Sequence, residues 1–399
     1  MRCSRYNSGV NSISEPVGSA TPSHQHVLEV ALYFLKLGVT AFGGPAAHIA
    51  LMHAEVVVRR KWVQEQRFLD LLGAANMIPG PTSTELAIFL GFERAGWSGL
   101  VLGGVCFILP AMLIVMALAW GYVRFGTTSQ VGWLFYGIKP VIIVIILQAL
   151  WGLGRKAVKN LPLGLVGVGV AGVYLLGGNV LLLLVAGGVI MLLLEVVRQR
   201  QKGTLLGFFL PLASWGLPLE AGPVSFSLPL LFLTFLKIGA VLYGSGYVLL
   251  AFLRADLVVH LGWLTDRQLL DAIAIGQVTP GPVFTTATFI GYMLGGVPGA
   301  LLATLGIFLP SFLFVAVAYP IFSRLRTWPG TAAFLDGVNA AALGLMAGVT
   351  WQLAGASLLD PLTFALALLA ALVLFRFKIN ATWLILAGAL VGIARMLWH

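Results

Sequence analysis

Long apolar stretches separated by short polar loops run through most of the chain. A polar stretch, residues 1–26, comes first and lacks the apolar core of a signal peptide. In the first half, apolar segments then cover about residues 27–58, 97–123, 130–153, 161–177 and 179–197. Segments of this length and character are typical of membrane-spanning α-helices. The pattern therefore predicts an all-α polytopic membrane protein with a disordered tail at residues 1–26.

The same motif interrupts the apolar pattern at two places. It is Pro79-Gly80-Pro81 in the first half and Pro280-Gly281-Pro282 in the second. Proline lacks an amide donor and clashes with the preceding turn, so a helix cannot continue through the motif. Residues 66–95 would then form two arms of about 12 residues, roughly 18 Å each, which is too short to span about 30 Å of hydrocarbon. A re-entrant helical hairpin is expected at each motif.

A helix that breaks at membrane depth leaves backbone N–H and C=O groups free, and this is tolerated where protein or a watery cavity satisfies them. The helix that starts after the break directs free N–H groups and a positive dipole end at that cavity, which suits an anion. A structural kink is the alternative, and Asn76 and Gln277 either donate to a ligand or cap freed backbone. The candidate anion-binding residues are Asn76, Pro79, Gly80, Pro81, Thr82, Ser83, Thr84 and Glu85 in the first hairpin, and Gln277, Pro280, Gly281, Pro282, Thr285 and Thr286 in the second.

The second half of the chain repeats the first at a nearly constant offset. The offset is 201 residues up to the first hairpin and 200 beyond it, as Trp62 with Trp263 and Gly137 with Gly337 illustrate. The longest match pairs Phe34-Leu35-Lys36-Leu37-Gly38 with Phe235-Leu236-Lys237-Ile238-Gly239. The sequence therefore predicts two membrane repeats, residues 27–202 and 226–399, joined by a proline-containing linker at 203–225.

Basic residues occupy different loops in the two halves. In the first half they follow the segments at 27–58, 130–153 and 179–197. In the second half they follow the counterparts of the segments at 97–123 and 161–177, and the loop around Asp360 has none. Because basic loops favour the cytoplasmic side, this difference predicts inverted repeats. The basic loops of both halves fall on the cytoplasmic side if each half crosses the membrane five times. This gives about ten crossings, two re-entrant hairpins and both termini outside.

Three lysines lie at mid-depth in apolar segments. Lys36 and Lys237 are repeat counterparts, and Lys139 has Asn339 as its counterpart. Buried charges of this kind face a partner or a cavity. One interpretation is a positive cavity for an anion, with Asn339 beside it; the other is an internal ion pair such as Lys36 with Glu85, or a lysine stretched toward a headgroup. Glu85 has no acidic counterpart, and it is a candidate proton carrier or a member of a structural pair.

Further polar and glycine positions recur near the hairpins. Phe42, Gly43 and Gly44 correspond to Tyr243, Gly244 and Ser245, and these breaks either contribute to the site or allow close helix packing. Asp70 and Asp271 are expected to begin or orient the hairpin helices at the membrane interface. His48 and His53 are expected at the interface too, and Trp62 and Trp263 are expected to anchor there.

Composition narrows the function. Hydrophobic residues make up 59% of the 399 residues and charged residues only 10%, so the net charge of +10 reflects topology rather than nucleic-acid binding. The two cysteines, Cys3 and Cys106, lie far apart, and no metal-binding or cofactor motif accompanies them. No phosphate-loop motif is present. The chain is therefore expected to be a gradient-driven transporter without a cofactor, and not an enzyme.

Six motifs together resemble the chromate ion transporter family in its two-domain, long-chain form. They are Phe42-Gly43-Gly44-Pro45, Pro79-Gly80-Pro81 with Ser83-Thr84-Glu85, Gly137-Ile138-Lys139-Pro140, Tyr243-Gly244-Ser245-Gly246, Thr279-Pro280-Gly281-Pro282 and Gly337-Val338-Asn339-Ala340. The resemblance covers about residues 27–395, and one departure is Thr82, where the family usually has Asn. It implies export of chromate across the bacterial cytoplasmic membrane, driven by the membrane potential or by protons, and chromate resistance. A homodimer is compatible with it.

Other functions stay open at this point. Chromate and sulfate are near-isosteric dianions, so a sulfate-type oxyanion importer on the same fold is the nearest alternative. An anion channel, in which the breaks line a continuous pore, is another. A membrane enzyme that reduces chromate is disfavoured by the two separated cysteines.

Overall fold

The computed structural model describes residues 24–126, 128–200, 225–243, 248–325, 329–377 and 381–398, and every regular element in these ranges is helical. The prediction of an all-α protein is therefore confirmed. The first half contains α1 (His24–Thr40), α2 (Gly44–Met52), the π-helix η1 (His53–Arg59), α3 (Glu65–Ala75), α4 (Thr82–Phe125), α5 (Ser129–Ala157), α6 (Leu161–Leu175) and α7 (Val180–Arg200). The second half contains α8 (Leu228–Val241), α9 (Leu249–Leu253), the π-helix η2 (Arg254–His260), α10 (Asp266–Val278), the short 3₁₀-helix η3 (Val283–Thr285), α11 (Thr286–Leu325), α12 (Pro329–Ser357), α13 (Pro361–Phe377) and α14 (Ala381–Trp398). The predicted linker and most of the predicted tail lie outside the described residues.

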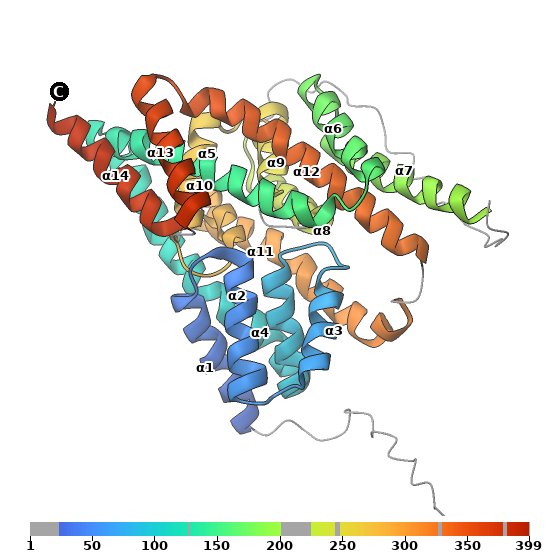
Figure 1. The fold of residues 1–399 in the computed structure, drawn as a ribbon. Coiled ribbons are helices and arrows are strands. Elements are labelled where there is room, and N and C mark those ends of the chain that lie inside the picture. Colours follow the sequence, from blue (N-terminus) through green and yellow to red (C-terminus); the bar gives the residue numbers. More distant parts are fainter. Residues whose placement is uncertain are drawn as a thin grey trace, which may run out of the picture.

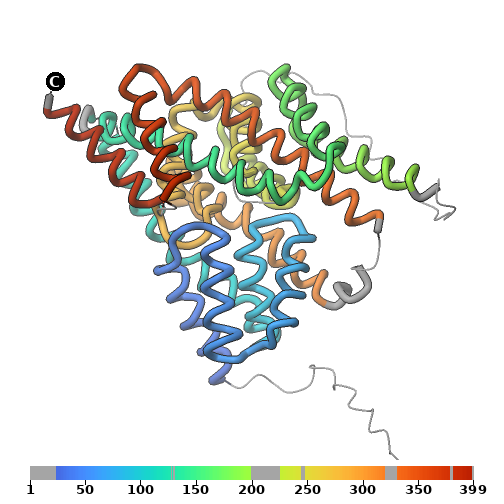
Figure 2. The backbone as a smooth tube through the Cα atoms, viewed as in Figure 1, coloured from blue at the N-terminus to red at the C-terminus, as the bar shows by residue number. Residues whose placement is uncertain are grey.

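The first apolar segment is a hairpin and not a single crossing. Helix α1 ends before Gly43 and Gly44, whose φ angles of 103° and 73° let the chain turn back into α2 (Figures 1 and 2). The far ends of the two arms meet again, because Glu29 near the start of α1 accepts a hydrogen bond of 3.0 Å from the indole of Trp62, just beyond η1. The prediction that residues 27–58 make one crossing is therefore wrong. The predicted count of ten crossings included this segment as one of them.

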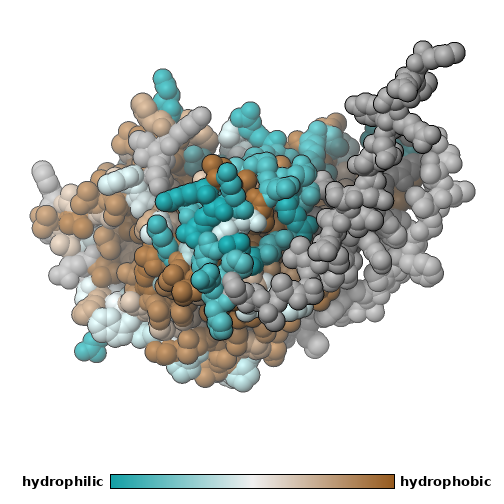
Figure 3. Space-filling view, turned by 90° about the horizontal axis from the view of Figure 1, so that it is seen from below, coloured by the Kyte–Doolittle hydropathy of each residue, from teal (hydrophilic) through white to brown (hydrophobic). Residues whose placement is uncertain are grey.

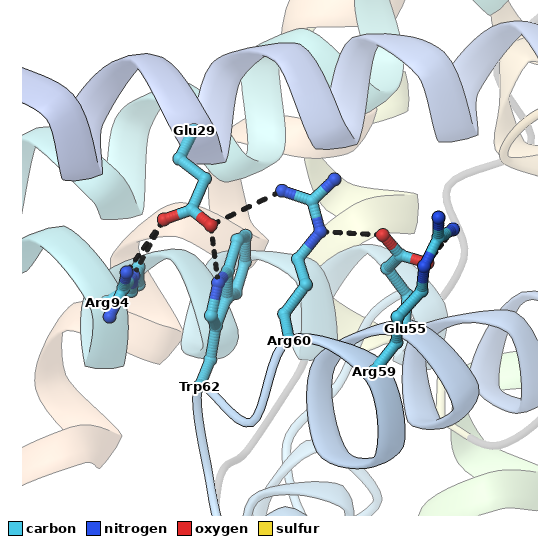
Figure 4. Close-up of polar contacts among 6 residues, drawn as sticks. All are labelled: Glu29, Glu55, Arg59, Arg60, Trp62 and Arg94. Carbon is cyan, nitrogen blue, oxygen red and sulfur yellow. Dashed lines mark hydrogen bonds and ion pairs between the residues drawn. The ribbon is translucent and has the colours of Figure 1, made fainter.

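A network of charged residues closes the outer end of this hairpin. Glu29 is also bound by Arg94, at 2.7 Å, and by Arg60, which in turn binds Glu55 at 2.6 Å (Figure 4). Arg94 immediately precedes the turn inside α4, so the start of α1, the loop after η1 and this turn share one end of the molecule. Trp62 contributes an aromatic edge to Tyr33 beside this network.

Helix α4 reverses direction at Ala95 and Gly96, which have non-helical backbone angles. A Cβ on Gly91 would lie 2.1 Å from the carbonyl oxygen of Gly99, so these glycines are in backbone contact; a continuous helix would separate them by about 12 Å. The result is a short arm, residues 82–94, packed against a long arm, residues 97–125. Together with α3, the short arm flanks Pro79-Gly80-Pro81, as the sequence predicts.

The irregular features of the first half recur in the second at the same offsets. Gly96 and Gly296 have φ angles of 58° and 61°, and both mark reversals in long helices. The π-helices η1 and η2 are offset by 201 residues. The ion pair of His53 with Glu65 corresponds to that of Arg254 with Asp266. These correspondences support the predicted duplication.

The two halves run in opposite directions where α4 packs on α11. The ring of Tyr319, near the end of α11, lies 4.2 Å from that of Phe92, beside the first hairpin. At the opposite end, Tyr122 of α4 lies 5.2 Å from Phe289, beside the second hairpin. The long arms of α4 and α11 are therefore antiparallel, which supports inverted repeats.

The last three helices of each half exchange partners between the halves. Helix α5 packs against α13 and α14, whereas α12 packs against α6 and α7. Glycines allow the crossings: a Cβ on Gly137 would lie 1.9 Å from the carbonyl oxygen of Gly388, and one on Gly337 would lie 2.3 Å from that of Gly187. Because each half completes the packing of the other, the two repeats form one interlocked unit.

The described residues include five helices that are long and apolar enough to cross a membrane, and four shorter apolar helices. Two of the five, α4 and α11, contain the reversals described above. Seen from below, hydrophilic side chains gather on the middle of the face, with hydrophobic side chains to the left of them and below (Figure 3). These are the features of an integral membrane protein, in which apolar flanks face lipid and polar ends face water.

Candidate functional site

The chain breaks after α1 and α8 meet the two Pro-Gly-Pro motifs inside the molecule. We call this meeting point the junction. The amide of Gly80 donates to the carbonyl oxygen of Leu242 at 2.7 Å, and the amide of Gly281 donates to that of Ala41 at 2.9 Å. Both pairs are related by the 201-residue offset. Each Pro-Gly-Pro motif is therefore tied to the end of the first helix of the other half. Tyr243 adds a third link, because its hydroxyl donates to the carbonyl oxygen of Met77 at 3.1 Å.

Only glycine fits at the centre of each Pro-Gly-Pro motif. Gly80 and Gly281 have φ angles of 137° and 86°, which residues with a side chain rarely adopt. Space is short as well, since a Cβ on Gly281 would lie 2.6 Å from Cβ of Ala111, and one on Gly80 would lie 2.2 Å from Oε1 of Glu85. The two motifs thus approach the opposite half closely enough to form backbone hydrogen bonds.

Helices begin at the junction in both halves. Helix α2 begins at Gly44, α4 at Thr82, and α11 follows η3 from Val283. The first turns of such helices have N–H groups without intrahelical acceptors, and each N-terminus carries roughly half a positive charge. The prolines at 81 and 282 direct these starts, because their extended backbone precedes the first helical residue. The helix N-termini therefore contribute positive potential at the junction.

The first hairpin places an unusual group of polar side chains at the junction. Glu85 is completely buried, and among the described residues neither of its carboxylate oxygens has a hydrogen-bond partner. The hydroxyls of Thr84 and Ser311 are buried without partners too. A Cβ on Gly80 would lie 2.2 Å from Oε1 of Glu85 and 2.7 Å from Oγ of Ser311, so both oxygens face the same point. Buried polar atoms are nearly always hydrogen-bonded, and such a group indicates a place that takes up a ligand or a proton.

His48 belongs to the junction, and the prediction that it lies at the interface is wrong. Its side chain is completely buried, with Nε2 3.2 Å from the carbonyl oxygen of Ala41 and Nδ1 3.4 Å from Oγ of Ser83. The reason is the hairpin of α1 and α2, which brings residues after the break back into the interior. His53, one turn later, instead pairs with Glu65 near the outer end of the hairpin.

The second hairpin is satisfied internally. The hydroxyl of Thr285 donates to the carbonyl oxygen of Pro282 at 2.8 Å, and that of Thr286 donates to the carbonyl oxygen of Val283 at 2.8 Å. Thr286 stands at the repeat position of Glu85, and Ala111 at that of Ser311. The two hairpins are therefore alike in backbone and different in chemistry: unpartnered hydroxyls and a carboxylate gather at the first.

Two of the three predicted lysines are ion-paired. Lys139 Nζ lies 2.9 Å from Oδ1 of Asp271, and Tyr122 donates to the other oxygen of this carboxylate at 2.8 Å. The sequence predicts that Asp271 begins or orients its helix at the membrane interface. The residue instead lies buried within α10, where it neutralises Lys139. Asn339, the repeat counterpart of Lys139, is partly buried on α12.

Lys237 and Lys36 differ although they are counterparts. Lys237 Nζ lies 2.6 Å from Asp256, beside a cavity of about 300 Å³ that Thr234 and His260 help to line. Lys36 is exposed and has no carboxylate partner among the described residues. The predicted alternative of a Lys36–Glu85 pair is therefore wrong.

The remaining predicted residues take different places. The side-chain amide of Asn76 donates to the carbonyl oxygen of Leu72 at 2.9 Å, so it caps α3, while Gln277 is partly buried near the end of α10. Phe42 is exposed at the first break. Gly244 and Ser245 lie outside the described residues.

Ser311 and His48 were not among the predicted site residues. Ser311 had a signal in the sequence, since it is a hydroxyl in an apolar helix, directly after the duplicated Leu309-Pro310. His48 had none that distinguished it from an interfacial histidine, because its burial depends on the reversal after Gly43.

Comparison with known proteins agrees with the duplicated architecture. A family model described as chromate transporter matches residues 28–192 and, separately, residues 230–393. The chain is 37% identical over 372 residues to the chromate transport protein of Cupriavidus metallidurans, covering 92% of each chain. It is 33% identical over 381 residues to the probable chromate transport protein of Synechococcus elongatus, and 32% identical over 391 residues to the chromate transport protein of Pseudomonas aeruginosa; the alignments cover 92% and 94% of this chain, and 94% and 93% of those relatives. No solved structure matches the chain.

The family model matches both halves, and these relatives are similar over nearly their whole length. Together with the apolar helices, this identifies an integral membrane protein built from two related halves. The chain belongs to the chromate transporter family.

Proposed function

We propose that this protein is a secondary active transporter of tetrahedral oxyanions that exports chromate across the bacterial cytoplasmic membrane and so confers chromate resistance. The observation that carries the proposal is the junction, where broken helices of both halves meet and unpartnered donors gather at the first hairpin. Broken helices whose N-termini face an anion at mid-depth are a recurring transporter design.

The donors at the first hairpin suit a dianion. The proposed donors are the backbone amides of residues 82 and 83 at the start of α4 and the hydroxyls of Ser83 and Thr84. The Thr84 hydroxyl has no partner among the described residues. Each hydrogen bond to a charged group contributes on the order of 1.5–3 kcal/mol. The helix N-termini supply positive potential. The N-termini, and not Lys139 or Lys237, are the proposed source of positive charge, because carboxylates already balance both lysines.

The reciprocal bonds at the junction favour a transporter over a channel. Both Pro-Gly-Pro motifs are in backbone contact with the opposite half, so the two halves meet directly at these points. Because the two bonds are separate, one can open while the other stays closed. We propose that alternating release of the Gly80–Leu242 and Gly281–Ala41 bonds exposes the anion to the two sides in turn.

Sulfate competes with chromate as the substrate, because both are tetrahedral dianions of similar size. A sulfate-type importer would use the same donors, and direction distinguishes it from an exporter. The relatives described as chromate transport proteins favour chromate. The membrane potential, negative inside, would drive a net negative charge outward.

Flux in proteoliposomes tests the proposal. Purified protein is reconstituted, a membrane potential is imposed, and chromate and sulfate movements are measured against protein-free vesicles. We expect chromate to accumulate against its gradient on the positive side. Absence of protein-dependent flux of either anion would contradict oxyanion transport. Accumulation to the equilibrium ratio of a bare dianion, with no saturation at high chromate concentration, would indicate a channel. Greater chromate sensitivity of expressing cells would indicate import.

A further inference from the structure

We propose that the oxyanion binds at the junction only when Glu85 carries a proton, so that anion and proton occupy the junction together and cross together. This inference rests on the proposed function, and it specifies what the transporter carries with the anion. It assigns the proton to one carboxyl group and gives the direction of the coupling.

The surroundings of Glu85 favour the neutral carboxylic acid. The side chain is completely buried, and among the described residues neither oxygen accepts a hydrogen bond. The described part of the chain provides no basic side chain in an ion pair with it, in contrast to Asp256 and Asp271. A buried carboxylate without a partner is strongly disfavoured and takes up a proton instead. The neutral acid has an O–H donor, and the Ser311 hydroxyl faces the same point as its Oε1.

The other titratable side chains at the junction come from two other breaks. Tyr243 follows α8 and donates its hydroxyl to the carbonyl oxygen of Met77 at 3.1 Å. His48, on α2, contacts the carbonyl oxygen of Ala41 and Oγ of Ser83. Helix α11 contributes the hydroxyl of Ser311, which does not titrate. Neither Tyr243 nor His48 neutralises Glu85, so its charge state depends on the proton.

The position of Glu85 couples this proton to the anion. Glu85 lies in the first turn of α4, whose free amides and hydroxyls are the proposed anion donors. An ionised carboxylate there would repel a dianion, while a neutral acid would not, and the anion in turn raises the affinity for the proton. Thermodynamic linkage makes the two effects equal. The anion and the proton therefore bind together.

One proton is expected per anion, because the second hairpin lacks the group. Thr286 stands at the position of Glu85, and its hydroxyl already donates to the carbonyl oxygen of Val283. The transported unit is then a dianion plus one proton, with one net negative charge. An inside-negative potential still drives it outward, but with half the electrical force that a bare dianion would experience.

A metal cation is a poorer occupant than a proton. Within the described ranges, no three side chains of His, Cys, Asp or Glu are grouped so as to hold a metal ion. One carboxylate and two hydroxyls leave most of the coordination shell of a hard cation unfilled.

The experiment counts protons directly. Chromate binding to purified wild-type protein is measured by calorimetry in buffers of different ionisation enthalpy, from about pH 6 to about pH 9, and Glu85→Gln is measured in parallel. Glutamine matches the shape of the neutral acid and cannot titrate. Because chromate itself gains a proton near neutral pH, sulfate serves as a second anion. Glu65→Gln, which alters an exposed carboxylate in an outer ion pair, is the matched control.

On the alkaline side, the wild type and Glu65→Gln are expected to take up about one proton per anion, and their apparent dissociation constant rises by up to about tenfold per pH unit. Glu85→Gln is expected to bind without this uptake and without this pH dependence. Uptake retained in Glu85→Gln would assign the proton elsewhere, to His48 or Tyr243, and overturn the inference. Anion binding by the wild type with no proton uptake at any pH would overturn it even if the variant failed to fold. Absence of binding of either anion would instead overturn the proposed function.

Discussion

The amide of Gly80 donates a hydrogen bond of 2.7 Å to the carbonyl oxygen of Leu242, although 162 positions separate them in the chain. Their counterparts, Gly281 and Ala41, form the same bond at 2.9 Å. The break in each half is thus hydrogen-bonded to the other half, whose equivalent helices run in the opposite direction. This relationship explains why the motif occurs twice and why its central residue is glycine in both places.

The first prediction concerns the space beside Gly80. In Gly80→Ala, the new Cβ would stand 2.2 Å from Oε1 of Glu85 and 2.7 Å from Oγ of Ser311. We expect this variant to lose chromate transport, because the side chains at the junction are displaced, and to lose about 1–3 kcal/mol of stability from the strained backbone. Transport in proteoliposomes and thermal unfolding in detergent measure the two effects.

Gly96→Ala is the matched control for backbone strain. Gly96 also has a positive φ, of 58°, but a Cβ there would meet nothing within 4 Å. We expect a similar loss of stability and retained transport. Equal loss of transport in both variants would mean that backbone strain, and not crowding at the junction, causes the defect.

The second prediction concerns the buried ion pair of Lys139 and Asp271. Removing one partner leaves an uncompensated buried charge, which costs about 3–5 kcal/mol. We therefore expect Lys139→Met to reduce thermal stability strongly, and the double variant Lys139→Met with Asp271→Asn to recover most of it. If Lys139 instead supplies charge to the anion, Lys139→Met will be stable and inactive, and the double variant will bring no recovery.

The third prediction concerns orientation in the membrane. Lys159 and Leu359 are repeat counterparts in exposed loops after α5 and α12. In a background without native cysteines, Lys159→Cys and Leu359→Cys are expected to react with an impermeant thiol reagent from opposite sides, because the long arms of α4 and α11 are antiparallel. Reaction of both from the same side would rule out inverted repeats.

The fourth prediction concerns pH and the loop before α13. A hydrogen bond from Tyr136, together with the backbone amide of Thr363 and the charge of Arg395, lowers the pKa of Asp360 from 3.8 to about 2. A lowered pKa stabilises the folded state above the unfolded value, and the contribution is lost as the pH falls through about 2. We expect Asp360→Asn to unfold at a lower temperature than the wild type at neutral pH.

The difference between Asp360→Asn and the wild type is expected to shrink between about pH 4 and about pH 2. It is expected to be small throughout, because the carboxylate is only partly buried and solvent screens its charge. Thermal unfolding across this range measures it. A difference that is independent of pH would indicate that the charge of Asp360 does not contribute.

The sequence was sufficient for the features that depend on local chemistry. The duplicated Pro-Gly-Pro motif locates the helix breaks because proline and glycine act on the backbone directly. The offset of 200 to 201 residues predicts equivalent elements, as seen in the reversals at Gly96 and Gly296. The capping role of Asn76 was also among the predicted alternatives.

Other features depend on contacts between distant segments. The hydropathy of residues 27–58 is the same for one crossing and for two antiparallel arms, so the sequence does not predict the hairpin of α1 and α2. The partners of Lys139 and Lys237 lie 132 and 19 positions away, and apolar periodicity does not reveal which carboxylate neutralises which lysine. The burial of His48 follows from the same hairpin, so the sequence does not predict it either.

The most direct test of the account compares the two hairpins in one binding measurement. The hydroxyl of Thr84 is buried without a partner among the described residues, whereas that of Thr285 already donates to the carbonyl oxygen of Pro282. A hydrogen bond to a charged group is worth on the order of 1.5–3 kcal/mol, and 1.4 kcal/mol is a factor of about ten in affinity. For chromate binding to purified protein, we therefore predict that Thr84→Val raises the dissociation constant about tenfold or more, while Thr285→Val leaves it nearly unchanged. An unchanged dissociation constant in Thr84→Val would contradict an anion site at the first hairpin.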